Sequence, residues 1–211
     1  ADSIDARGDV NLNGEANEIA DDVLFSNYFI FGLSVFTENT AGQVAATDTN
    51  ADGMTLTVAD LVYLIRVVVG DAMPYTKLSP VVASYSIRDG TLAVDQPMGA
   101  AFVVVSGQAI PKLETERMDM RFNFDGEHTR ILISSFEPGA EFEGDFLSVD
   151  APVVSVELAT YEGARVQAEL RPDGFNLDQN YPNPFNPTTQ ISFRLPQQSD
   201  YSLVIYNIAG Q

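Results

Sequence analysis

The sequence has no cysteine, no tryptophan and a single histidine. Without cysteine the chain can form no disulfide scaffold, no thiolate metal site and no cysteine nucleophile. Basic residues are also scarce, because 11 Lys and Arg stand against 30 Asp and Glu, for a formal net charge of −19. So acidic a chain is poorly suited to bind nucleic acid or an anionic membrane surface, whereas it suits the binding of cations.

Long apolar runs are missing too. The longest, near residues 61–69, is interrupted by Arg66 and is shorter than the roughly 20 residues that span a bilayer, so we expect no membrane insertion. The sequence starts at Ala1 without a basic and apolar leader, as in a mature form after signal cleavage or in a protein that is not exported. A length of 211 residues allows one large domain or two small ones.

A stretch rich in Asp, Asn and Gly occurs twice, as DVNLNGEANEIAD at residues 9–21 (the first loop) and DTNADGMTLTVAD at residues 48–60 (the second loop). Asp9 and Asp48 stand 39 positions apart (48 − 9), and the same offset pairs four further positions. These pairs are Asn11 with Asn50, Asn13 with Asp52, Gly14 with Gly53, and Asp21 with Asp60. The match indicates one unit that has been duplicated.

The spacing within each loop is typical of calcium binding. Calcium takes six to eight oxygen ligands, so loop positions one, three and five turn side-chain oxygens inward and a glycine then makes a sharp turn. The next residue would give its backbone carbonyl, and an acid at the start of the following helix would complete the coordination. That acid stands one position later than in the standard loop and is Asp rather than Glu, in both copies. The predicted ligands of two calcium ions are Asp9, Asn11, Asn13, Glu15 and Asp21 in the first loop and Asp48, Asn50, Asp52, Met54 and Asp60 in the second.

A helix is predicted after each loop. Apolar residues recur with helical spacing over residues 19–31 and 58–69, and a glycine follows each segment, at Gly32 and Gly70. Each unit is therefore a calcium loop followed by a helix, without the entering helix of an ordinary EF-hand.

With these motifs, residues 5–72 resemble dockerins, small calcium-dependent modules in which two loop–helix units pack antiparallel and bind cohesin domains. The resemblance implies the same side-chain ligands in both loops. It also implies that partner recognition falls at Ile19 and Ala20 and at Val58 and Ala59; the alternative is that Ile19 and Val58 face the core of the helix pair. Residues 1–73 are expected to form this module, with residues 33–47 as a linker between its halves.

Residues 74–171 have the pattern of an antiparallel β-sandwich. Short segments of β-branched and aromatic residues alternate with turn signals such as Asp125-Gly126. About eight strands are expected, at residues 81–87, 91–94, 100–106, 118–124, 129–135, 146–149, 153–160 and 164–170. The number of strands and the Gly99-Ala100 strand start resemble a cohesin domain. The chain would then be an α+β multidomain protein.

Residues 172–188 form a linker rich in Pro and Asn, because proline lacks the N–H that helices and central strands need. The run NYPNPFNPTTQISFRLP at residues 180–196, followed by YSLVIYNIAGQ, resembles the start of the C-terminal sorting domain of the type IX secretion route. This implies an incomplete Ig-like β tail over residues 189–211, with strands at 189–195 and 201–208 whose unpaired edges could add to a neighbouring sheet.

Together these features predict a secreted, non-enzymatic calcium-binding structural protein at the outer cell surface or in the extracellular matrix, where calcium is abundant. Its partner would be itself, as a homo-oligomer or polymeric fibre, or a cohesin-like domain. No catalytic residue is predicted, since the lone His128 lies beside a hairpin turn and acidic residues on turns mostly serve solvation.

The alternative is the non-catalytic C-terminal region of a larger secreted hydrolase, which it tethers. In that case the sandwich would bind carbohydrate through exposed aromatic residues, for which the candidates are Tyr85, Phe102, Phe122 and Phe124. Core packing is the simpler explanation of these aromatics, and the absence of tryptophan counts against sugar stacking.

Overall fold

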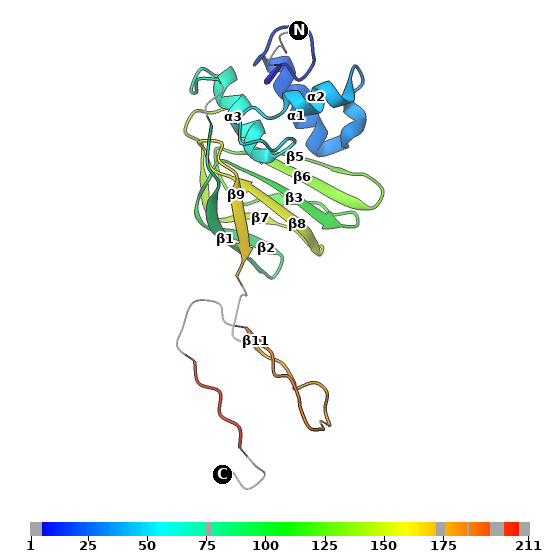
Figure 1. Ribbon diagram of the computed structural model, residues 1–211, viewed down its shortest axis with the longest axis vertical. Helices are drawn as coiled ribbons and strands as arrows, with labels where there is room; N and C mark the ends of the chain where they lie inside the picture. Colours follow the sequence, from blue (N-terminus) through cyan, green and yellow to red (C-terminus); the bar gives the residue numbers. More distant parts are fainter. Residues whose placement is uncertain (1–5, 75–76, 172–175, 185, 195–200, 207–211) are drawn as a thin grey trace. The chain divides into compact units, whose positions relative to one another are not determined.

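The computed structural model describes residues 6–74, 77–171, 176–184, 186–194 and 201–206 (Figure 1). The N-terminal part holds the helices, which are α1 (Ile19–Phe31), the short 3-10 helix η1 (Leu33–Val35), α2 (Thr40–Ala46) and α3 (Val58–Val68). No helix within these described ranges is long and apolar enough to cross a membrane.

The two expected helices are confirmed, and the local sequence explains where they start and end. α1 follows Glu18 and α3 follows Thr57, and each N-terminus has a capping box completed by Asp21 or Asp60. Gly32, with φ of 77°, ends α1.

Residues 33–47 are more than the linker that was expected, because they contain η1 and α2. The Asn39 side chain caps α2 by accepting the Gly42 N–H at 3.1 Å. Gln43 of α2 is buried and its amide donates to the Val10 carbonyl at 3.0 Å, so this segment supports the first loop.

Two sheets form a β-sandwich from nine strands within residues 77–171, in agreement with the predicted architecture. One sheet has the order β4-β7-β2-β1-β9 and the other the order β5-β6-β3-β8. The strands are β1 Val81–Arg88, β2 Thr91–Met98, β3 Ala100–Ser106, β4 Lys112–Leu113, β5 Asp119–Phe124, β6 His128–Ser134, β7 Phe142–Ser148, β8 Val153–Ala159 and β9 Val166–Leu170. The prediction missed β4, whose two residues are too short to show an alternating pattern.

The sandwich core lies between the two sheets. Leu92, Val103, Ile131 and Phe146 are fully buried there, and Met118 and Met120 belong to the same cluster. All neighbouring strands pair antiparallel except β1 and β9, which run parallel.

The helices cover the outer face of the sheet β5-β6-β3-β8 (Figure 1). A second apolar cluster, the helix–sheet cluster, joins α1 and α3 to Ala100, Leu132 and Ala159 of that sheet. The Phe29 ring meets the Phe102 ring edge-on at 5.1 Å between centroids. Residues 1–170 thus form one compact unit, and the domain boundary expected after residue 73 lies inside it.

Residues 171–211 form a separate unit. In its described part β10 (Asn176–Leu177) pairs antiparallel with β11 (Phe193–Arg194), and an isolated bridge joins Tyr181 to Gln190. Within the described part of the strand expected at 189–195, these two short pairings are the only ones that form. Residues 201–206 of the strand expected at 201–208 have no strand partner, and an isolated extended segment is not stable as a strand without one. The rest of both predicted strands lies outside the described residues.

Candidate calcium loops

The two loops have the same backbone conformation. Three pairs of positions 39 residues apart adopt positive φ: Leu12 (59°) with Ala51 (56°), Gly14 (94°) with Gly53 (89°), and Asn17 (64°) with Leu56 (65°). A left-handed conformation is unfavourable for leucine and alanine and persists only where the surroundings require it. Because the same positions are left-handed in both copies, the two loops match in backbone conformation as well as in sequence.

In the first loop the side-chain oxygens of the predicted ligands fold back over the loop backbone. Asp9 accepts the N–H groups of Asn13 at 3.0 Å and Gly14 at 2.9 Å, and Asn13 accepts the Glu15 N–H at 2.8 Å. Asp21 closes the loop from α1, because its two oxygens accept the N–H groups of Asn11 and Glu18, each at 3.0 Å.

The second loop repeats this pattern in a more enclosed setting. Asp48 accepts the Gly53 N–H at 3.3 Å, and Asp52 accepts the Met54 N–H at 2.8 Å. Asn50 is fully buried, whereas its counterpart Asn11 is partly exposed.

Asp60, which closes the second loop, is fully buried. Its Oδ2 accepts the Thr57 hydroxyl at 2.6 Å and the Thr57 N–H at 3.1 Å, but its Oδ1 has no hydrogen-bond partner. Burial is the main cause that raises the pKa of Asp60 to about 8; the nearby charges of Asp52 and Asp48 add to the rise, and the Thr57 hydrogen bonds oppose it. Burial likewise raises the pKa of Asp21. Both closing acids therefore stand where a cation would stabilise the charged form.

Calcium chemistry fits these donors. Among the described residues, no three His, Cys, Asp or Glu side chains form a cluster that could hold a metal ion, so carboxylates alone do not make either site. Calcium also accepts amide and backbone carbonyl oxygens, which Asn11, Asn13 and Asn50 and the carbonyls of Glu15 and Met54 could supply. The fully buried Asp60 Oδ1, which has no hydrogen-bond partner, is the feature of the second loop that best fits a cation.

The predicted partner-binding residues fall into two different environments. Val58 and Ala59 are fully buried in the helix–sheet cluster. Ile19, by contrast, is 65% exposed, and Ala20 is also exposed. Ile19 therefore does not face the core of the helix pair, and Val58 lies where the helices meet their own sandwich.

Several residues around the loops were not anticipated from the sequence. Glu18 accepts the side-chain amides of Asn11 at 3.0 Å and Asn13 at 2.5 Å, and Glu157 of β8 accepts the Val58 N–H at 2.6 Å. Glu18 could have been found, because it directly precedes the predicted helix where a cap is expected. Nothing in the sequence pattern points to Glu157, which is 99 residues away from Val58.

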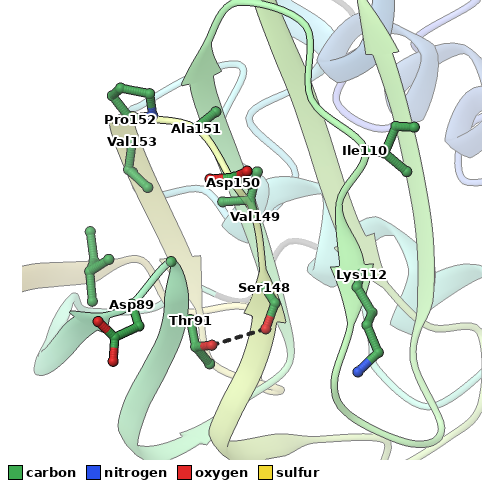
Figure 2. Close-up of a pocket in the computed structure, with 12 residues that line it drawn as sticks. Asp89, Thr91, Ile110, Lys112, Ser148, Val149, Asp150, Ala151, Pro152 and Val153 are labelled. Atoms are coloured by element: carbon green, nitrogen blue, oxygen red, sulfur yellow. Dashed lines mark hydrogen bonds between the residues drawn. The ribbon is translucent and has the colours of Figure 1, made fainter.

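A cavity of about 720 Å³ lies between the turns β1–β2 and β7–β8 of the sandwich (Figure 2). Thr91 and Ser148 share a hydrogen bond of 3.0 Å between their hydroxyls, and Asp89 and Lys112 lie on opposite sides in Figure 2. Lys112 pairs with Glu114 at 2.8 Å. The residues lining the cavity include no histidine or cysteine and none of the predicted site residues.

The aromatic candidates for carbohydrate binding do not form one platform. Phe102 packs beneath α1, and Tyr85 packs against the sandwich core. Phe122 and Phe124 stand two positions apart on the edge strand β5, so they share one face of it, and they are 43% and 37% exposed. His128 starts β6 beside the turn, with its Nδ1 4.0 Å from the Glu127 carboxylate.

Comparison with known proteins gives one distant likeness. No protein-family model matches the chain, and no curated protein sequence matches it. Among solved structures, a non-cellulosomal cohesin from the hyperthermophilic archaeon Archaeoglobus fulgidus aligns at a TM-score of 0.27 and 12% identity, over 44% of this chain and 80% of that chain. The description of residues 77–171 as a β-sandwich rests on the strand order of its two sheets.

Proposed function

We propose that the protein is a secreted, non-enzymatic calcium-binding module that mediates assembly. The observation that carries calcium binding is the fully buried Asp60 carboxylate, whose Oδ1 has no partner. An unpaired buried anion is costly, and a bound cation would remove that cost. The first loop has the same backbone and a closing acid at the same position, so it would bind a second ion.

The ions would hold the loops in their strained conformation and fix where each helix starts. Thousandfold excess calcium over the dissociation constant would add about 4 kcal/mol per site to folding stability. Such an excess is natural outside the cell, which agrees with the resemblance of residues 180–211 to a sorting domain and supports a location at the cell surface or in the matrix.

The two repeats differ in how far equivalent helix residues are buried, and this difference supports assembly. Val58, Ala59 and Val62 of α3 are buried in the helix–sheet cluster, with exposures of 0%, 0% and 5%. The residues 39 positions earlier are Ile19, Ala20 and Val23, which have nearly the same side chains. Ile19 and Val23 are 65% and 48% exposed. The first repeat thus presents a second copy of the surface that the other repeat buries against a sheet.

This exposed surface would bind a sandwich of the same kind on another chain, as in a dockerin–cohesin pair. If the other chain is a second copy, the contact repeats and gives a homopolymeric fibre. The exposed apolar segment Tyr201–Tyr206 would add a second contact by strand addition to an open sheet edge.

The alternative is a tethering, carbohydrate-binding region of a larger secreted hydrolase. The partial exposure of Phe122 and Phe124 is the observation that favours it. The positions of Phe102 and Tyr85 favour assembly instead, because both rings are packed within the protein. Retention on insoluble polysaccharides would support the alternative.

The deciding experiment is particle sizing by light scattering and electron microscopy in millimolar calcium and after chelation. We expect oligomers or fibres with calcium and monomers without it. Ile19→Asp should abolish assembly, whereas the control Ile110→Asp should not, because Ile110 is 86% exposed and lies in the loop between β3 and β4. A monomer in both conditions would exclude self-assembly and favour the tethering function.

A further inference from the structure

The second loop is joined to the sandwich through its predicted ligands. Asn50 donates its side-chain amide to the Gly163 carbonyl at 3.0 Å, and the Asp52 carboxylate lies 3.6 Å from Arg165 Nε. Both partners belong to the turn between β8 and β9, residues 160–165, here called the β8–β9 turn. Because the side-chain NH2 of Asn50 donates to Gly163, its Oδ1 lies on the opposite side of the amide. This Oδ1 accepts the Asp52 N–H at 3.0 Å.

A third contact reaches the start of α3. The Val58 N–H, two residues before Asp60, donates to Glu157 of β8 at 2.6 Å. Helix N-termini leave N–H groups unpaired and favour a nearby carboxylate. Glu157 therefore helps to fix the end of α3 from which Asp60 closes the loop.

The first loop obtains equivalent support from its own residues. Glu18 accepts the amides of Asn11 and Asn13, the counterparts of Asn50 and Asp52. The residue equivalent to Glu18 in the second repeat is Thr57, whose short side chain instead bonds Asp60. In the first loop the residues at these two positions are held by Glu18 of the loop itself, whereas in the second loop they are held by the sandwich.

Close packing holds the β8–β9 turn against α3. Gly163 has φ of 84°, and a Cβ atom there would lie 2.8 Å from the Cβ of Tyr63. Arg66 of α3 donates to the Glu162 carbonyl at 3.2 Å, and its guanidinium lies 4.7 Å from the centre of the Tyr161 ring. A side chain at position 163 would therefore push the turn away from the helix and from Asn50.

We propose that the second loop and the sandwich form one composite calcium site, in which Glu157, Gly163 and Arg165 are positioning residues. Ion binding there and docking of α3 on the sheet are then coupled, whereas the first loop binds its ion independently of docking. Coupling is reciprocal, so the ion strengthens docking by the same factor by which docking strengthens ion binding. This inference rests on the proposed calcium binding.

The test is a calcium titration of the full chain followed by NMR. The amides of Gly14 and Gly53 report the two loops separately, because each donates to the first acid of its own loop. Gly163→Ala should shift the Gly53 titration to about tenfold higher calcium, within the usual 5- to 150-fold range of coupling between sites. The Gly14 titration should stay within about twofold, and the Val58 amide should exchange faster with solvent because its bond to Glu157 loosens.

Gly107→Ala is the matched control. Gly107 also has positive φ, 77°, but nothing lies within 4 Å of a Cβ atom there, so it reproduces the backbone strain without the collision. Glu157→Met, which removes the Val58 acceptor without adding bulk, gives a second variant if Gly163→Ala does not fold, and it should also shift Gly53 alone.

Three results would overturn the coupling: no shift of Gly53 in either variant, equal shifts of Gly14 and Gly53, or the same shift in Gly107→Ala. If neither glycine of the unmodified protein responds to calcium, calcium binding itself fails and the coupling with it. A response in both glycines of the unmodified protein without selective shifts in the variants leaves calcium binding intact and rejects only the composite site.

Discussion

The first and second loops share one backbone but differ in their surroundings. Asn13 of the first loop is exposed and Asn11 is partly exposed, and Glu18 supports both from within the loop. In the second loop Asn50, the counterpart of Asn11, is fully buried, and support comes from a turn more than 100 residues further along the chain. The closing acids Asp21 and Asp60 are both fully buried. A duplicated motif can therefore keep its shape while one copy becomes part of a larger packing unit.

Removal of calcium should have the largest effect and tests whether both loops contribute. We expect chelation to lower the free energy of unfolding by about 4 kcal/mol for each site that is saturated a thousandfold. Urea unfolding in calcium, in chelator and in magnesium measures this, with magnesium as the control because its strict octahedral geometry fits such loops poorly. Equal stability in calcium and chelator would contradict two structural ions.

Substitution of the closing acids Asp60 and Asp21 should have the second largest effect and should distinguish the two loops. In calcium, Asp60→Asn should cost about 3 kcal/mol, since it breaks a buried ionic contact. In chelator at a pH above the Asp60 pKa of about 8, where the carboxylate is ionised, the same substitution should stabilise the protein by about 1 to 2 kcal/mol, because it removes an unpaired buried charge. Unfolding curves of Asp60→Asn in calcium and in chelator show whether the substitution lowers or raises the free energy of unfolding in each condition.

Asp21→Asn tests whether this change of sign between calcium and chelator is specific to the second loop. Both Asp21 oxygens accept backbone N–H groups, so the carboxylate is satisfied without an ion and its replacement should not stabilise the protein in chelator. A reversal of sign in both variants would show that the closing acids are equivalent, despite the unpartnered Oδ1 of Asp60.

The sequence predicted the local features and missed the long-range ones. The repeat offset, the helices after each loop and most strands depend on spacing that a single sequence contains. The contacts that join the second loop and α3 to the sandwich come from Glu157, Gly163 and Arg165, which lie about 100 residues further along the sequence. α2 was missed although Asn39 provides a cap, because its seven residues are too short to show a clear period.

Glu18→Ala tests the self-sufficiency of the first loop and should have a smaller effect. Loss of its bonds to Asn11 and Asn13 should weaken calcium binding at the first loop by about 1 kcal/mol, roughly fivefold, without changing the second loop. Glu15→Ala is the control, because Glu15 is exposed and is expected to contribute only its backbone carbonyl. If both variants weaken the first loop equally, Glu18 has no special role.

Deletion of residues 187–211 should have the smallest effect on stability, below about 0.5 kcal/mol, because these residues belong to a unit separate from both loops. Tyr201, Ile205 and Tyr206 are 66%, 74% and 66% exposed, so their removal exposes little buried apolar surface.

Any consequence of the deletion should appear in assembly size, measured by light scattering in calcium. Unchanged particles would rule out strand addition and leave the exposed face of Ile19 and Val23 as the contact between chains. Smaller particles with unchanged calcium titrations would show that the tail and the loops act independently.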